Sequence, residues 1–157
     1  MLGQLNITEI EDLLKGQIIG RIGCHADDTT FVVPISYAYD GEYVYAHTRE
    51  GLKISLMRKN QRVCFEVDEI HDMANWKSVI AWGEFEELKD PGERNKGLEI
   101  LTHRILPLIS SVTTHLSPHW PFATDDISEI KGIVFRIRLT DKSGRFENNF
   151  SSPELNG

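Results

Sequence analysis

The sequence has little of several features that mark secreted, membrane-spanning or nucleic-acid-binding proteins. Its two cysteines, Cys24 and Cys64, lie far apart and outside any CxxC pair, which excludes a disulfide scaffold and disfavours structural zinc. No apolar run approaches the roughly 18 residues of a membrane span, and the start, MLGQLNITEIEDLL, lacks the pattern of a signal peptide. Lys and Arg number 17 against 24 Asp and Glu, and this net charge of −7 disfavours nucleic acid as a partner. We therefore expect a cytoplasmic protein with buried, reduced thiols.

Motifs of several common enzyme classes are also missing. The sequence contains no HExxH, P-loop, GxGxxG or GxSxG pattern. His115 and His119 have the spacing of a helical metal pair, but Pro118 between them disfavours a helix. We therefore expect no metal site.

What is present fits one globular domain. The chain has 157 residues, of which 40% are apolar and 26% charged, as in ordinary folded proteins. We expect a single domain over residues 1–147. The last residues, 148–157, show no apolar pattern and are expected to form a flexible tail.

The apolar pattern predicts a mainly β protein with peripheral helices. Helices are expected near residues 8–16, 48–60 and 90–107, and strands near 17–24, 31–39, 42–47, 62–70, 77–88 and 131–139, with 108–128 irregular. About six strands in hairpin-rich order, with helices inserted between them, favour a small antiparallel barrel over a βαβ repeat.

Individual residues sharpen this outline. Asn6 or Thr8 is expected to cap the first helix, Thr8 forming a capping box with Glu11. Pro34 marks an edge strand or a bulge, because proline has no N–H to donate to a ladder. The Asp40-Gly41 pair predicts a tight hairpin, and Gly83 predicts a bulge.

The segment from His47 to Lys53 is the first candidate binding site. It joins a strand end to a helix start, where unpaired N–H groups attract anions. Thr48 is expected to cap the helix, and Lys53 adds a full charge that Arg49 or Arg58 could reinforce. The segment therefore fits a terminal phosphate, although an ordinary capped helix with solvated charges is the more common arrangement.

The second candidate is the strand segment VPISY, residues 33–37. A bulge at Pro34 would free main-chain polar groups beside an apolar wall, where the polar edge of a flat heterocycle could pair. An edge strand that tolerates a proline explains the same pattern, and local pattern alone favours that explanation.

Taken together, these segments resemble a known family. The run VVPISYAYDGEYVYAHTREGLKISLMRKNQRVCFEVDE, followed by WKSVIAWGEFEEL and GIVFRIRLTDKSGRFE, is similar to the flavin-binding split-barrel family related to pyridoxamine 5′-phosphate oxidase. The resemblance covers roughly residues 8–147 and looks closest to the nitroimidazole-resistance-like branch. It implies a six-stranded antiparallel Greek-key split β-barrel, forming a homodimer with FMN in each of two clefts between the chains.

The resemblance also assigns residues. Strand residues 33–37 match those along the flavin ring, and residues 46–48 match the strand end near ring and phosphate. Lys53 matches the lysine that holds the FMN phosphate, and Ser78 matches a polar position usually contributed by the partner chain. His47 is the candidate catalytic residue. The full set of expected cofactor-binding residues is Val33, Pro34, Ile35, Ser36, Tyr37, Ala46, His47, Thr48, Lys53 and Ser78.

Two departures argue against a true pyridoxamine 5′-phosphate oxidase. Those enzymes have arginine before the phosphate lysine, where this chain has Leu52, and a basic C-terminal segment, where this chain ends in ENNFSSPELNG. The leading hypothesis is an FMN-dependent reductase of small aromatic or nitro compounds, in which His47 donates a proton to the substrate or orients it. The alternative is a non-catalytic module that binds a flavin, haem or the deazaflavin F420, with His47 or a histidine of 115–119 as haem ligand.

Overall fold

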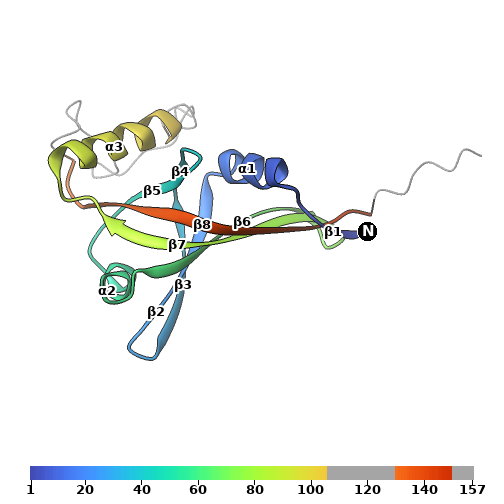
Figure 1. Ribbon diagram of the computed structural model, residues 1–157, viewed down its shortest axis with the longest axis horizontal. Coiled ribbons are helices and arrows are strands. Elements are labelled where there is room, and N and C mark those ends of the chain that lie inside the picture. The colour runs from blue at the N-terminus through green and yellow to red at the C-terminus, as the bar shows by residue number, and fades with distance from the viewer. Residues whose placement is uncertain (106–129, 150–157) are drawn as a thin grey trace, which may run out of the picture.

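The computed structural model describes residues 1–105 and 130–149. In these residues the elements follow the order β1 (Leu2–Gln4), α1 (Ile7–Gly16), β2 (Ile19–Ala26), β3 (Thr29–Ser36), β4 (Ala38–Tyr39), β5 (Tyr43–Thr48), α2 (Leu52–Lys59), β6 (Arg62–Asp72), β7 (Asn75–Glu87), α3 (Pro91–Ile105) and β8 (Ile133–Glu147). Eight strands, two more than expected, form one antiparallel sheet. The helices α1 and α3 lie on one side of the long strands β7 and β8, and α2 lies on the other side beside β2 and β3 (Figure 1).

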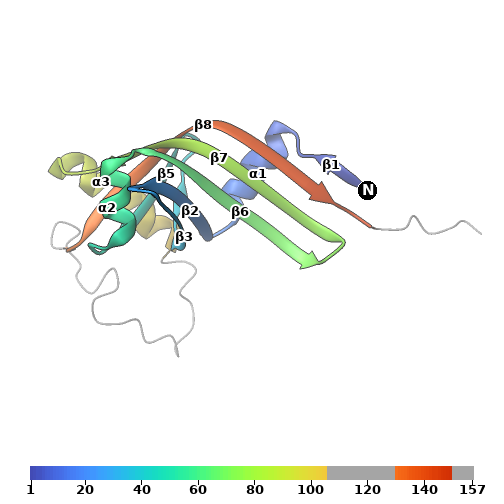
Figure 2. The same ribbon diagram turned by 90° about the horizontal axis from the view of Figure 1, so that it is seen from below.

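The sheet curls into a split barrel. Its strand order is β3-β2-β6-β7-β8-β5-β4, with β1 added to the far end of β8. The two ends of this order come together, because β3 contacts β5 without pairing with it (Figure 2). The predicted fold class, a mainly β split barrel with peripheral helices, is therefore confirmed.

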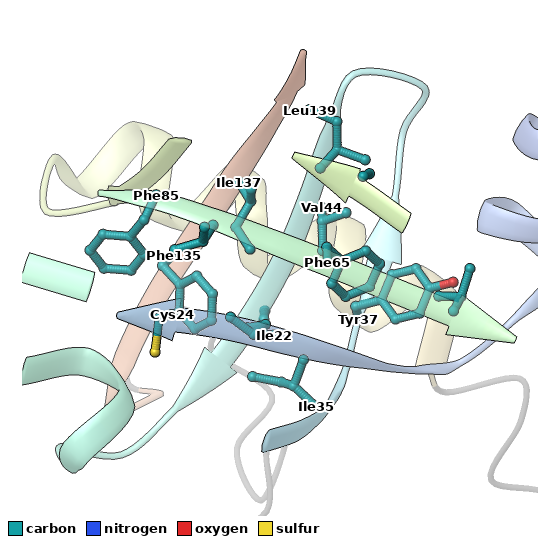
Figure 3. Packing of buried hydrophobic residues seen from close by; sticks show 14 of the residues in the cluster. Ile22, Cys24, Ile35, Tyr37, Val44, Phe65, Phe85, Phe135, Ile137 and Leu139 are labelled. Atoms are coloured by element: carbon teal, nitrogen blue, oxygen red, sulfur yellow. The ribbon is translucent and has the colours of Figure 1, made fainter. Parts of the chain in front are cut away.

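Alternating side chains fill the barrel. Inward positions of β2, β6, β7 and β8 are apolar and almost fully buried, among them Ile22, Phe65, Val79 and Phe135. The ring of Tyr37 packs edge-on against Phe65, with ring centroids 4.8 Å apart (Figure 3). This core follows directly from the two-residue period of the strands.

Several local expectations are confirmed. Asp40 Oδ1 accepts hydrogen bonds from the N–H groups of Glu42 and Tyr43, and Gly41 has a φ of +102°, which favours glycine. The predicted start of α3 is also right, since Asp90 caps the N–H of Glu93. Each turn residue supplies the hydrogen bond that its position requires.

The sheet confirms two further expectations. Pro34 lies on β3, which among the described strands pairs only with β2 and so forms a sheet edge. The register of β7 against β8 shifts between Trp82 and Gly83. At Gly83 a Cβ would lie 2.2 Å from the carbonyl oxygen of Arg138, so glycine permits the close approach of the two strands.

Other expectations are wrong in detail. The capping box of α1 is formed by Asn6 and Glu9, because the helix begins two residues before the Thr8–Glu11 pattern requires. Thr48 does not cap α2; it is the last residue of β5, and Gly51 is the N-cap. Strand β8 continues eight residues beyond the expected end at 139, because it pairs with β7 as far as Glu147.

The predicted irregular region, 108–128, lies outside the described residues, and so do the histidines of 115–119. Of the predicted tail, residues 148 and 149 are described: the main chains of Met1 and Asn148 bond each other, and the N–H of Asn149 donates to Asn75. No helix in the described ranges is long and apolar enough to cross a membrane. Within the same ranges, no three His, Cys, Asp or Glu residues are grouped as metal ligands.

Candidate flavin site at the opening of the barrel

The structure brings together two of the predicted segments at the opening of the barrel. Residues 33–37 run along β3 and out of its end, and residues 46–48 end β5, which contacts β3. Five residues after Thr48, Lys53 lies in the first turn of α2. Chain continuity and the closing of the sheet therefore place strand edge, strand end and helix start in one region.

Along the edge of β3, the main-chain N–H and C=O groups of alternate residues point away from β2, toward the opening of the barrel. The N–H of Tyr37 donates to the carbonyl of Ile18, so the hydrogen-bonded pairs with β2 include Tyr37, Ile35 and Val33. The main-chain groups of Ser36 and Pro34 then point away from β2. Proline occupies a position where no ladder N–H is needed, and the Ser36 N–H is the donor that this edge offers a ligand.

Side chains of the predicted set differ in what they can contribute. Ile35, Tyr37 and Ala46 are buried in the core, so a ligand would meet only their main chain. Pro34 is exposed, and Ser36 and Thr48 are half-buried. The backbone of this segment is therefore better placed than its side chains to contact a flat ring.

Lys53 is a half-buried cation at the start of α2. No carboxylate lies within ion-pair distance of it in the described ranges, and burial lowers the pKa of its ammonium group. Gly51 provides no side-chain cap, so no side chain occupies the first-turn N–H groups. A half-buried ammonium group beside uncapped N–H groups has the chemistry that a phosphate needs.

The basic residues suggested as substitutes behave differently. Arg58 forms ion pairs with two carboxylates: its Nη2 lies 2.8 Å from Glu50 Oε1 and 2.6 Å from Glu87 Oε1. These contacts raise the pKa of its guanidinium group. They disfavour Arg58 as a phosphate ligand, whereas Arg49 is exposed and close enough to His47 to lower the pKa of its ring.

His47 is half-buried on the side of β5 that faces α3. Its Nε2 lies 2.6 Å from the carbonyl oxygen of Lys131. Burial is the main reason why the pKa of the ring is lowered, and the cations of Arg94 and Arg49 lower it further. The lowered pKa favours the neutral ring and so disfavours the expected role as a ready proton donor.

Ser78 lies far from this region within one chain. It pairs with Arg145 near the far end of β8, whereas Thr48 pairs with Ile133 at the near end. The 12 residues between these partners correspond to about 40 Å of strand. Ser78 instead donates a 3.2 Å hydrogen bond to Glu66.

Sequence reasoning missed the polar cluster around Ser78. Arg21 Nη1 bridges Glu66 and Asp68 at 3.2 and 3.1 Å. Burial and the nearby Asp68 raise the pKa of Glu66. The strand alternation could have placed these residues on one face, but only the strand order shows that β2, β6 and β7 are neighbours.

Surface cavities of 260 to 900 Å³ lie in the described part of the chain. Those beside Trp82, Arg136, Ile100 and Trp76 are not lined by any predicted cofactor-binding residue.

The comparison with protein families decides the relationship. The pyridoxamine 5′-phosphate oxidase family profile matches residues 6–146. The chain belongs to this family. This confirms the family that the segments VVPISYAY and AHTREGLK had suggested.

One sequence relative and two solved structures show how similar the chain is to known proteins. An uncharacterized protein of Rhizobium meliloti is 34% identical over 80 residues, which span 51% of this chain and 53% of that protein, about half its length. A crystal structure of an FAD-binding protein from Mesorhizobium loti is 27% identical, with a TM-score of 0.72, covering 94% of this chain and 99% of that one. A protein from Bacteroides thetaiotaomicron, described as a candidate 5-nitroimidazole antibiotic resistance protein, shares the fold at 16% identity and a TM-score of 0.69, covering 93% of this chain and 87% of that one.

Proposed function

We propose that this family member binds a flavin, with FMN as the preferred form, and reduces small aromatic or nitro compounds. The observation that carries the proposal is Lys53, a half-buried cation without an acidic partner in the described ranges, in an uncapped helix turn. The M. loti relative, described as FAD-binding, supports a flavin. We favour FMN because its single terminal phosphate suits a site with one such lysine.

Each part of the site has a separate role in this proposal. A bound flavin would supply the electron chemistry, and the chain supplies binding and electrostatics. Lys53 and the first-turn N–H groups of α2 neutralise the phosphate, while the Ser36 N–H at the edge of β3 pairs with the ring. His47 orients the substrate as a neutral hydrogen-bonding group, since its pKa is lowered.

We further propose that the substrate is not pyridoxamine 5′-phosphate. Leu52 stands where those oxidases carry arginine, and its side chain is exposed beside Lys53. Residues 147–157, ENNFSSPELNG, contain no basic residue, so this segment offers no cation to a substrate phosphate. A substrate without a phosphate, such as a small nitroaromatic compound, makes no demand on this segment.

The test is flavin titration of the purified chain, followed by its visible spectrum and fluorescence. FMN should bind more tightly than FAD, and Lys53→Ala should raise the FMN Kd about 10- to 100-fold, the cost of losing a charged hydrogen bond. Lys59→Ala is the matched control, because Lys59 lies at the other end of α2 and pairs with Asp27. Binding that is unchanged in Lys53→Ala, or no binding of either flavin, would contradict the proposal.

We also propose a homodimer in which the partner chain supplies Ser78. Ser78 is about 40 Å along β8 from the Thr48 end of the site, too far to reach it within one chain. Apolar side chains remain exposed on the outer face, including Trp82 (45%) and Val32 (65%). Sedimentation should give twice the mass of one 17.9 kDa chain, and a flavin-loaded monomer would contradict the proposal.

The two free thiols agree with a reducing, cytoplasmic location. Burial raises the pKa of Cys24, which keeps this thiol protonated and unreactive.

A further inference from the structure

Three successive carbonyl groups at the start of β8 are held by side chains from two other elements. The middle one, that of Lys131, lies 2.6 Å from His47 Nε2. Those on either side, from Ile130 and Gly132, accept hydrogen bonds from Arg94 Nη2 at 2.5 and 3.2 Å. Arg94 belongs to α3 and His47 to β5, so this short segment connects the helix to the end of the strand.

The contact at His47 fixes where a ring proton lies. A carbonyl oxygen can only accept a hydrogen bond, so the nitrogen 2.6 Å from it must be the donor. The ring therefore carries a proton on Nε2. In the neutral ring, Nδ1 then bears the lone pair and acts as an acceptor.

Gly132 makes this approach possible. Its φ of +104° lies in the region that favours glycine. A Cβ there would lie 2.7 Å from the carbonyl oxygen of Thr48 and 2.8 Å from His47 Nε2. Any side chain at this position would therefore push the segment away from both residues of the strand end.

We propose that Arg94 and Gly132 are positioning residues, which hold the Lys131 carbonyl against His47 and so fix its ring as the Nε2–H tautomer. The proposal rests on the proposed function only in placing His47 at the flavin site. Its chemical consequence is that the Nε2 proton of His47 is engaged by the main chain and is not available for transfer to a substrate.

The experiment is ¹H–¹⁵N NMR of the imidazole groups in the flavin-free chain, with His47→Gln to assign the signals. In the unsubstituted chain the His47 proton should lie on Nε2 and be visible, because the hydrogen bond slows its exchange with water. Arg94→Gln and Gly132→Ala should each broaden or abolish that signal through faster exchange. Arg94→Lys should restore it in part, since an ammonium group can still donate to a carbonyl.

Arg104→Gln is the matched control. Arg104 also lies on α3 and also donates to main-chain carbonyls, those of Gly16 and Gln17, but at the end of α1. Replacing Arg104 by glutamine should leave the His47 NMR signal unchanged. The inference is overturned by a proton on Nδ1 in the unsubstituted chain, or by a signal that survives both Arg94→Gln and Gly132→Ala.

A parallel FMN titration separates this inference from the proposed function. Arg94→Gln should leave the FMN Kd nearly unchanged, because the flavin contacts proposed above come from Lys53, the first-turn N–H groups of α2 and the Ser36 N–H, whereas Arg94 donates to the main chain before β8. If no flavin binds but the NMR signals behave as stated, the proposed function fails and the positioning role stands. If FMN binds and neither substitution changes the His47 signal, the positioning role fails and the proposed function stands.

Discussion

The hydroxyl group of Tyr37 donates a 2.5 Å hydrogen bond to the main-chain carbonyl of Leu14, at the far end of α1. Both residues are buried, and burial raises the pKa of the Tyr37 phenol. The bond fastens α1 to the point where β3 runs into β4. Tyr37 therefore contributes a structural side chain to the barrel opening, although its segment resembles the one that lies along a flavin.

Tyr37→Phe should lower the free energy of unfolding by about 1–3 kcal/mol, because the Leu14 carbonyl would be left buried and unpaired. Flavin affinity should stay the same, since the hydroxyl points into the core. Urea unfolding and flavin titration measure the two effects. A large loss of affinity at unchanged stability would show that the hydroxyl group faces the ligand.

Gly83→Ala should destabilise the sheet by about 1–3 kcal/mol or more, because the new Cβ would meet the Arg138 carbonyl at 2.2 Å. Gly16→Ala is the control: a Cβ there meets nothing within 4 Å. Alanine at the end of α1 should be neutral, or stabilising by up to about 1 kcal/mol. Thermal unfolding of both variants checks the contrast, and equal effects would contradict the packing at Gly83.

Gly51→Asp should stabilise the chain slightly and weaken FMN binding. An aspartate at the N-cap satisfies the first-turn N–H groups, a gain of a few tenths of a kcal/mol over glycine. The same carboxylate competes with and repels a phosphate, so the FMN Kd should rise about tenfold or more, near 1.4 kcal/mol. Gly51→Ser caps without charge and should weaken binding less; equal affinities in all three chains would place the phosphate elsewhere.

Glu87→Gln should change how stability depends on pH. Hydrogen bonds from Arg58 hold the pKa of Glu87 below its usual value of 4.5. A lowered pKa stabilises the fold above pH 4.5, and this contribution is lost as pH falls through the lowered value. The variant should therefore be less stable at pH 7, and the difference should shrink below pH 4.5.

Glu50→Gln is the control for this pair, because Glu50 contacts the same arginine. The Glu50 side chain is 68% exposed and that of Glu87 14%. Solvent screens the exposed pair, so Glu50→Gln should have the smaller effect. Unfolding midpoints between pH 3 and pH 7 measure both, and a pH-independent difference for Glu87→Gln would contradict the assignment.

Local sequence signals predicted what depends on neighbouring residues. The Asp40-Gly41 turn, the helix start near residue 90 and the strand near 62–70 follow from short-range hydrogen bonds and the two-residue period of a strand. Boundaries were less certain. Asn6 and Thr8 are both good caps, and the structure uses Asn6 with Glu9 and not the expected Thr8–Glu11 box, because the neighbouring chain decides between them.

The candidate site was likewise predictable only where it depends on residues that are close in the sequence. The sequence identified Thr48 to Lys53 as a helix start, and the resemblance supplied the residues of β3. The sequence could not show that Arg58 pairs with Glu87, which lies 29 residues away, or that Arg94 donates a hydrogen bond to the main chain just before β8. Such contacts depend on strand order, which local patterns do not encode.

By itself the sequence determined the class of fold, the family and the position of the candidate phosphate site, because each rests on residues adjacent in the chain. Only the tertiary structure decided which cations remain available and which nitrogen of His47 carries the proton. It also showed that Ser78 lies away from the rest of the site within one chain. These properties arise where strands distant in sequence meet, so distance, burial and charge become defined only when the barrel closes.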